Sequence, residues 1–256
     1  MKAFNNDPKV KADILEQFEL FNKGMAILKA AKKDPKIQAV GNAIKVNKIS
    51  QKDDLVYCTI SSGEQELYHS LTDLGIPERI QWAKDAILMH FSSEERAAWN
   101  EKLFKAIPVG ADLSFVWPEF AIWLLTDDKY GVIKYAETYK QRQLIRAVCW
   151  AYAVNSPLKS FIEKVDENLR KQISLMLAEE IYEKIKDNQS AFNALWTAVG
   201  ALHLLTEKEP LDPPITSMAA MANAHGNFLE KDVVDVFFEC TRKQFEKLIE
   251  LLEKGK

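Results

Sequence analysis

Residues 76–106 read IPERIQWAKDAILMHFSSEERAAWNEKLFKA, and this stretch contains the start signals of two consecutive helices. Pro77 stands where a first helical turn loses nothing from the missing N–H of proline. Ser92 and Glu95 have the spacing of a capping box, in which each side chain accepts a hydrogen bond from the other residue's backbone N–H. Helices joined by so short a connection are antiparallel neighbours, so the stretch predicts a helix hairpin.

Helix signals of the same kind continue on both sides of this hairpin. Asp7 and Pro8 predict the start of a first helix, which is expected to stop near Asp34 and Pro35. The sequence as a whole therefore predicts an all-α fold, either an irregular multi-helix bundle or a short array of helix hairpins. Further helices are expected from Pro118, over 129–139 capped by Asp127, over 141–154, across 157–205 with a break near 187–188, over 217–225 ending at Gly226 as a C′ residue, and over 230–254.

Residues 35–62 are the least helical part of the chain. VYCTI at 56–60 is β-branched and aromatic, and IQAVGNAIKV at 37–46 contains a Gly-Asn pair. These features predict a small β-hairpin near residues 37–60, with a broken helix as the alternative. We expect three parts: 1–62 as an N-terminal helix with an irregular appendage, 63–205 as the main helical body, and 206–256 as a proline-rich loop with a C-terminal helical lobe packed on that body.

Composition narrows the class of protein. The 256 residues are 47% hydrophobic, which suffices for a core without a metal or disulfide, and the net charge of −3 argues against nucleic-acid binding. The three cysteines form no CxxC pair and fit a reducing compartment. The N-terminus has no signal-peptide pattern, and the longest apolar runs are far shorter than the ~20 residues of a membrane span. We therefore expect a cytoplasmic protein without a membrane span.

Catalytic signatures are missing from the sequence. The four histidines show neither HxxxH nor HExxH spacing, and the phosphate-binding loop, the dinucleotide-binding glycine pattern and the hydrolase nucleophile elbow are absent. We predict no catalytic, cofactor-binding or metal-binding residues, and no cofactor. An enzyme of an unusual kind stays open as an alternative.

Two tryptophans stand out in SFVWPEFAIWLL at 114–125, the most apolar stretch of the chain. Large rings near a helix start can line a groove for a partner, so Trp117 and Trp123 are candidate partner-binding residues. Aromatic residues at helical spacing also serve as core, and this interpretation is the alternative for both.

A second candidate surface combines charge and aromaticity. Tyr139, Arg142, Arg146 and Trp150 are separated by three, four and four residues, so they share one face of a helix. Guanidinium groups beside aromatic rings can bind a partner's carboxylate or stack on its side chains. The alternative is that both arginines are solvated ends over buried stems.

The last helix has a wide apolar face. It includes Val236, Phe237, Phe245, Leu248 and Leu252. Burying one such side chain stabilises a fold by ~1.5–3 kcal/mol, so the face is expected to be covered. It either closes the helical body or forms the seam of a homo-oligomer.

Residues 130–154, YGVIKYAETYKQRQLIRAVCWAYAV, resemble the central segment of a bacterial all-helical family of unknown function that is associated with type VI secretion gene clusters. Residues 132–135 match the first helix of the family's pair, and residues 147–151 match the second. The flanking segments 91–99 and 211–222 are also similar. The chain departs from the family at Ile145-Arg146, where the family has Arg-Glu, and at Cys149, where it has tryptophan. The resemblance implies a non-enzymatic accessory role.

These observations together predict a helical adaptor or accessory protein that binds another protein, in line with a role in a bacterial secretion system. One alternative is an enzyme or small-ligand-binding protein with a site between helices, which a pocket with two or more convergent histidines or carboxylates would favour. Another alternative is an immunity or antitoxin protein that binds a toxin one to one.

Overall fold

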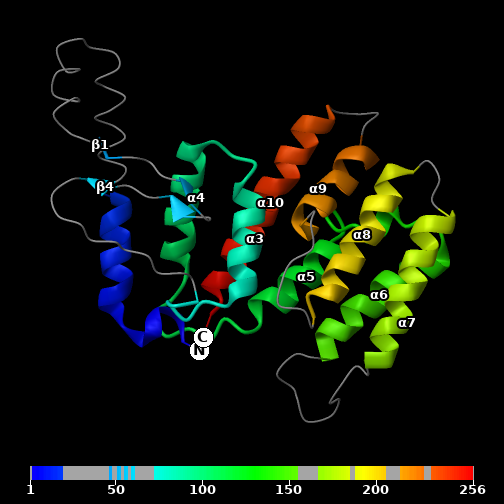
Figure 1. Cartoon of the computed structure of the whole chain (residues 1–256), viewed down its shortest axis with the longest axis horizontal. Helices are drawn as coiled ribbons and strands as arrows, with labels where there is room; N and C mark the ends of the chain where they lie inside the picture. The colour runs from blue at the N-terminus through cyan, green and yellow to red at the C-terminus, as the bar shows by residue number, and fades with distance from the viewer. Residues whose placement is uncertain are drawn as a thin grey trace.

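The computed structural model describes residues 2–19, 72–154, 167–184, 188–205, 214–227 and 232–255, together with four two-residue strands between 46 and 60. The described residues are almost entirely helical, which confirms the all-α prediction for this part of the chain (Figure 1). No described helix is long and apolar enough to cross a membrane.

The described part of the chain contains the following helices. In chain order they are η1 (Ala3–Asn6), the helical residues 8–19, α3 (Glu78–Leu88), α4 (Ser93–Ala106), α5 (Val116–Thr126), η2 (Ile133–Tyr135), α6 (Tyr139–Val154), α7 (Glu167–Glu179), the π-helical segment η3 (Glu180–Lys184), α8 (Gln189–His203), α9 (Ile215–Gly226) and α10 (Val233–Glu253).

The strands are β1 (Val46–Asn47), β2 (Gln51–Lys52), β3 (Leu55–Val56) and β4 (Thr59–Ile60). β1 pairs antiparallel with β4, and β2 pairs antiparallel with β3. The other residues of the 37–60 stretch lie outside the described part, as does the predicted end of the first helix near residues 34–35. The small β-hairpin therefore stays a prediction.

Local capping signals set several helix starts as the sequence predicts. The Ser92 hydroxyl accepts from the Glu95 N–H at 3.3 Å, and the Ser92 N–H donates to the Glu95 carboxylate at 3.2 Å, which completes the predicted capping box. Asn188 caps α8 by accepting from the Ala191 N–H at 3.0 Å, so the predicted break near 187–188 is confirmed. Asp232 caps α10 by accepting from the Val234 N–H at 2.7 Å, so this helix begins at Val233 and not at residue 230 as predicted.

The helix predicted over 129–139 is wrong. Asp127 accepts from the N–H groups of Lys129 and Tyr130, as a cap does, but the chain then turns back and the Val132 N–H donates to the Leu124 carbonyl at 3.1 Å. Only the single turn η2 follows. Tertiary packing decides this, because Val132 is fully buried and the tight turn places Gly131 where a Cβ would collide with the Asp127 backbone.

Gly226 is also used differently from the prediction. It is the last residue of α9 and does not adopt the left-handed conformation of a C′ glycine. A Cβ at this position would collide with the ring of Tyr135. Glycine is therefore required here by the close approach of Tyr135 and not by helix termination.

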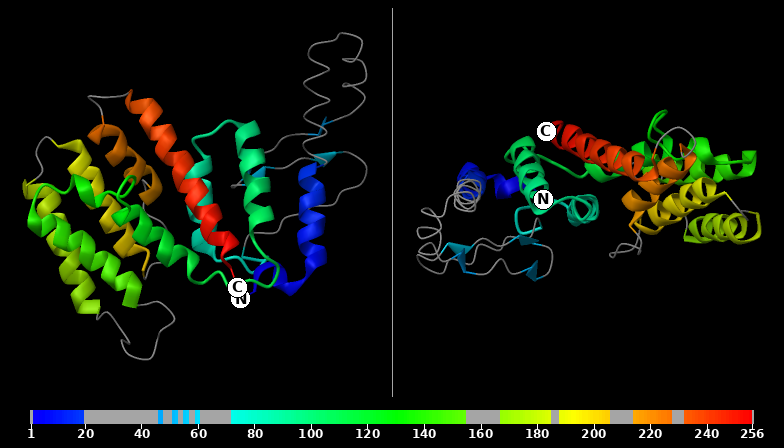
Figure 2. Two further views of the ribbon diagram at one scale, coloured as in Figure 1. Left: turned by 180° about the vertical axis from the view of Figure 1, so that it is seen from behind. Right: turned by 90° about the horizontal axis from the view of Figure 1, so that it is seen from above.

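The C-terminal helix α10 packs across the middle of the molecule, with α9 on one side and α3 and α4 on the other, and it also contacts α5 (Figures 1 and 2). Its apolar face, including Phe245, Leu248 and Leu252, is buried within its own chain. The last helix therefore closes the helical body, which was one of its two predicted roles. A homo-oligomer through α10 stays a prediction. One core cluster joins residues from all three predicted parts of the chain, and the division into those parts stays a prediction as well.

The two ends of the described chain lie close together (Figure 1). The Ala3 N–H donates to the Ala111 carbonyl at 3.0 Å, and Gly255 packs against the side chains of Ala111 and Leu113. Phe4 is fully buried beside Phe104, so the N-terminal residues are part of the core.

His90, which packs against α9 and α10, is expected to make the stability of the fold pH-dependent. Its Nε2 lies 3.0 Å from the Ser217 hydroxyl of α9, its ring packs edge-on against Phe237 of α10, and burial lowers its pKa below the usual 6.5. Between that lowered pKa and pH 6.5 the unfolded chain binds more protons than the folded protein. The contribution of neutral His90 to the free energy of unfolding is therefore expected to be complete above pH 6.5 and to decrease as the pH falls from 6.5 to the lowered pKa.

Urea unfolding at about pH 7.5 and about pH 5.5 measures this effect. Other groups titrate in the same range, so the matched comparison is His90→Gln, which keeps a hydrogen-bonding partner for Ser217 without a titrating ring. The wild-type midpoint should drop more between the two pH values than the midpoint of this variant. Equal drops would contradict the role of His90.

Candidate functional site

The two tryptophans predicted to bind a partner lie in and beside the core. Trp117 is only 5% exposed, and its indole N–H donates to the Tyr152 hydroxyl at 3.2 Å. Trp123 is half-buried between the rings of Phe120 and Tyr130, with centroids 6.1 Å from each. The indole of Trp117 is therefore not part of the surface, while Trp123 keeps one partly exposed edge.

The helical stripe predicted on residues 139–150 lies on α6, as expected, and most of it faces outward. Tyr139 is 71% exposed, Trp150 is 49% exposed, and Arg146 between them is exposed. Arg142 lies to one side, where its guanidinium donates to the Ala136 carbonyl at 2.7 Å and closes the end of η2. Three of the four residues thus share an accessible face, and the fourth is held by the backbone.

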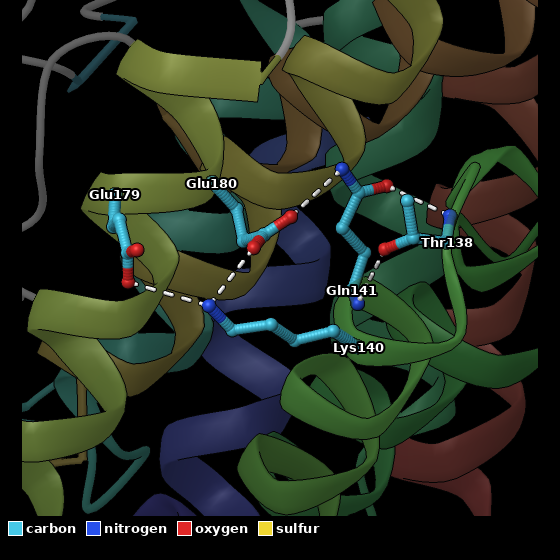
Figure 3. A network of polar contacts seen from close by, with 5 residues as sticks. All are labelled: Thr138, Lys140, Gln141, Glu179 and Glu180. Atoms are coloured by element: carbon cyan, nitrogen blue, oxygen red, sulfur yellow. Dashed lines mark hydrogen bonds and ion pairs between the residues drawn. The ribbon is translucent and has the colours of Figure 1, made fainter.

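A polar network fixes the start of α6 against α7 (Figure 3). Thr138 and Gln141 form a capping box: the Gln141 N–H donates to the Thr138 hydroxyl at 3.1 Å, and the Gln141 side-chain oxygen accepts from the Thr138 N–H at 3.3 Å. The Gln141 amide then donates to the carboxylate of Glu180 at 3.2 Å. The ammonium of Lys140 lies 3.0 Å from Glu180 and 3.3 Å from Glu179.

The charges of this network are paired across the contact between α6 and the end of α7. Glu180 is 1% exposed, so its carboxylate is removed from water and is compensated by Gln141 and Lys140. Hydrogen bonds to Glu180, and then to Glu179, raise the pKa of Lys140. Tyr139 lies in sequence between Thr138, which caps α6, and Lys140, which is paired with Glu179 and Glu180, so the backbone of Tyr139 is held in place.

The π-helical segment η3 adds a second set of exposed apolar residues beside α6. The wider turn lets the adjacent residues Glu180 and Ile181 both face inward, and Tyr182 then points outward with 74% exposure. On α7, Leu175 is 70% exposed, while Ile173 and Leu177 are buried.

We call the resulting surface the α6–α7 face and define it by Tyr139, Arg146, Trp150, Leu175 and Tyr182. The two helices lie side by side at the end of the molecule opposite residues 8–19 (Figures 1 and 2). The two helices contact one another and both turn their buried residues toward one core cluster, so their exposed residues point away from that core. Seven large apolar side chains in the described residues are exposed, and five of them are on α6, α7 and η3: Tyr139, Trp150, Leu169, Leu175 and Tyr182.

The charge on this face is positive around Arg146. Between residues 139 and 154 the helix carries Lys140, Arg142 and Arg146 and no acidic residue, although the whole chain has a net charge of −3. Lys140 is paired with α7 and η3, and Arg142 is bound to a carbonyl. Arg146 makes no ion pair with any residue that the structure describes. Its guanidinium is therefore available to a carboxylate from outside.

The α6–α7 face offers recognition and no evident catalytic chemistry. Burial raises the pKa of Cys149, the one cysteine of α6, to about 12, so its thiol stays protonated and unreactive near neutral pH. Within the described ranges, no group of three histidine, cysteine or acidic side chains could hold a metal ion.

Two residues of this face were not predicted from the sequence. Leu175 and Tyr182 are out of phase with the buried series Ile173, Leu177 and Ile181, and this mismatch is the one signal that could have indicated them. It is weak, because a single apolar residue outside the core stripe is common on protein surfaces. Only the structure shows that both are exposed and that the helix α7 lies against α6.

The fold and the face together define an all-helical protein with an exposed aromatic and basic surface on one helix pair. Comparison with known families, curated proteins and solved structures gives no match to the chain.

Proposed function

We propose that the protein is a cytoplasmic adaptor that binds an acidic, amphipathic segment of another protein on the α6–α7 face. The observation that carries this proposal is the exposure of four large apolar side chains on the α6–α7 face together with an arginine that has no ion-pair partner in the described residues. Aromatic residues and arginine are the residue types that dominate binding energy in protein interfaces.

The chemistry of the partner follows from the face. A carboxylate would pair with Arg146, and apolar side chains would cover Tyr139 and Trp150 on α6 and Leu175 and Tyr182 on α7 and η3. An amphipathic helix with acidic residues along one edge supplies both groups. An accessory role in a bacterial secretion system is a further proposal, supported by the resemblance of residues 130–154, although residues 133–135 form only the turn η2.

Affinity capture of the tagged full chain from its own cells tests this function. Trp150→Ala is expected to lower recovery of a stoichiometric partner about 30-fold, because truncating a central interface tryptophan costs roughly 2 kcal/mol. Arg146→Glu should lower recovery at least as much, since it brings a like charge to an acidic partner.

The matched control is Val234→Ala, which removes another exposed apolar side chain at the start of α10 and should leave recovery unchanged. Far-UV circular dichroism should show the same helicity in all variants. Equal recovery by the wild type, Trp150→Ala and Arg146→Glu would contradict binding at this face. A preparation without any stoichiometric partner would contradict the adaptor function.

A further inference from the structure

A cavity of about 330 Å³ lies on another part of the molecule, between the turn after α5 and the helices α9 and α10. Its walls carry both signs of charge. Lys129 and Lys134 come from the turn, Asp128 from the same turn, and Glu239 from α10. A cavity of this size is at the lower end of the range that holds small organic ligands.

The polar walls are held in place by hydrogen bonds. The Asn223 amide donates to the Tyr130 carbonyl at 2.8 Å, and its oxygen accepts from the Tyr135 hydroxyl at 3.1 Å. The Asn227 amide donates to the same hydroxyl at 3.2 Å. Burial raises the pKa of Tyr135 to about 12, so this hydroxyl stays protonated and keeps bridging α9. The ring of Tyr135 fits against Gly226, which explains why glycine is needed there.

Lys134 is one of the two lysines that line the cavity. The residue as a whole is exposed, but its ammonium is enclosed enough that burial lowers its pKa. This ammonium donates to the Lys129 carbonyl and makes no ion pair with the residues that the structure describes. A carboxylate in the cavity would compensate this charge.

Glu239 and Asp128 are the acidic residues of the lining. Glu239 accepts from the Tyr130 hydroxyl at 3.3 Å, and the ammonium of Lys129 lies over the Tyr130 ring, 5.0 Å from its centroid. A purely anionic ligand would meet the like charges of Glu239 and Asp128. A ligand with one carboxylate and one ammonium group avoids this repulsion and offers an opposite charge to both kinds of charged residue in the lining.

We propose that this cavity binds a small zwitterion, a free α-amino acid, with its carboxylate toward Lys134 and its ammonium toward Glu239 and Asp128. The site is independent of the α6–α7 face, so either proposal can fail without the other. Val236 and Cys240, which also line the cavity, give it an apolar patch for the side chain of the ligand.

Thermal unfolding of the full chain in the presence of each of the twenty proteinogenic L-amino acids tests the proposal. At ten times its Kd, a bound amino acid is expected to raise Tm by about 3–6 °C. Acetate and inorganic phosphate serve as anions without an ammonium group, and ethylamine serves as a cation without a carboxylate. None of these three should produce the shift. A shift with acetate or phosphate as large as with the best amino acid would overturn the zwitterion assignment, and so would the absence of a shift with all twenty.

Lys134→Met and Glu239→Gln locate the site by isothermal titration calorimetry with the best amino acid. Each variant should weaken binding at least tenfold, because each removes one charge that the ligand meets. Lys105→Met, which changes an exposed lysine on α4 away from the cavity, should bind as the wild type does. Unchanged affinity in both cavity variants would overturn the placement of the ligand.

Discussion

Replacing Gly75 by alanine is expected to lower the free energy of unfolding by about 2–4 kcal/mol. Gly75 has a φ of +73°, where an L-residue is strained, and a Cβ added here would collide with the backbone carbonyl of Lys2. Lys2 has little freedom to move away. The next residues are fixed by the Phe4 N–H, which donates to the Leu74 carbonyl at 2.6 Å, and by the Asn5 amide, which donates to the Asp73 carbonyl at 2.8 Å.

The upper end of this range is set by detachment of the N-terminal segment. If the collision releases residues 2–7, the fully buried ring of Phe4 is lost from the core, and losing a buried phenylalanine costs roughly 3–5 kcal/mol. Urea unfolding followed by circular dichroism gives the difference in free energy.

Gly110→Ala is the matched control for Gly75→Ala. Gly110 has nearly the same φ, +74°, but its added Cβ would meet the side chain of Asn6, which can rotate away. This variant should therefore show mainly the backbone strain of about 1–2 kcal/mol. Equal losses in the two variants would contradict the packing of the Lys2 backbone against Gly75.

The second large effect is expected for Tyr152→Phe, which should lower the free energy of unfolding by about 2–4 kcal/mol. The Tyr152 hydroxyl is buried where α5, α6 and α8 meet. It accepts from the Trp117 indole N–H at 3.2 Å and donates to the Ala201 carbonyl at 2.6 Å. Ala201 is in the last turn of α8, where the Leu205 N–H donates to Leu202 instead. Phenylalanine would leave two buried polar groups without these partners, at about 1–3 kcal/mol each.

Tyr135→Phe tests whether the loss comes from burial. It also removes a hydroxyl that bridges two groups, Asn223 and Asn227, but Tyr135 is only half-buried and both asparagines line an open cavity, so water can replace the hydroxyl as their partner. We expect a loss below about 1 kcal/mol for this control. Urea unfolding measured by tryptophan fluorescence compares the two. A similar small loss in Tyr152→Phe would show that the buried network contributes little to stability.

Much of the helical architecture was predictable because its signals are local. The capping box of Ser92 and Glu95, the cap at Asn188 and the cap at Asp232 each satisfy backbone N–H groups within a few residues. Such signals act in any tertiary context. The alternation of apolar residues in 139–154 likewise placed Tyr139, Arg146 and Trp150 on one face of α6.

Exposure was harder to predict than helix position. Trp117 and Trp150 both lie at helical spacing among apolar residues, yet Trp117 is a core residue and Trp150 is half-exposed. A periodic pattern shows which residues share a face and does not show which face a neighbouring helix covers. Among the candidate partner-binding residues, Tyr139, Arg146 and Trp150 of α6 are exposed, and Leu175 and Tyr182 of the neighbouring α7 and η3 are exposed as well.

By itself, the sequence determined where several of the described helices begin and which residues of α6 share a face, because caps and periodicity depend on neighbours within a few residues. The tertiary structure alone decided that residues 129–139 form a turn and not a helix, that Gly226 accommodates Tyr135, and that α6 and α7 contact one another. It also assembled the charged cavity from the turn, α9 and α10. These features depend on contacts between residues up to about a hundred positions apart, and no local pattern encodes such distances.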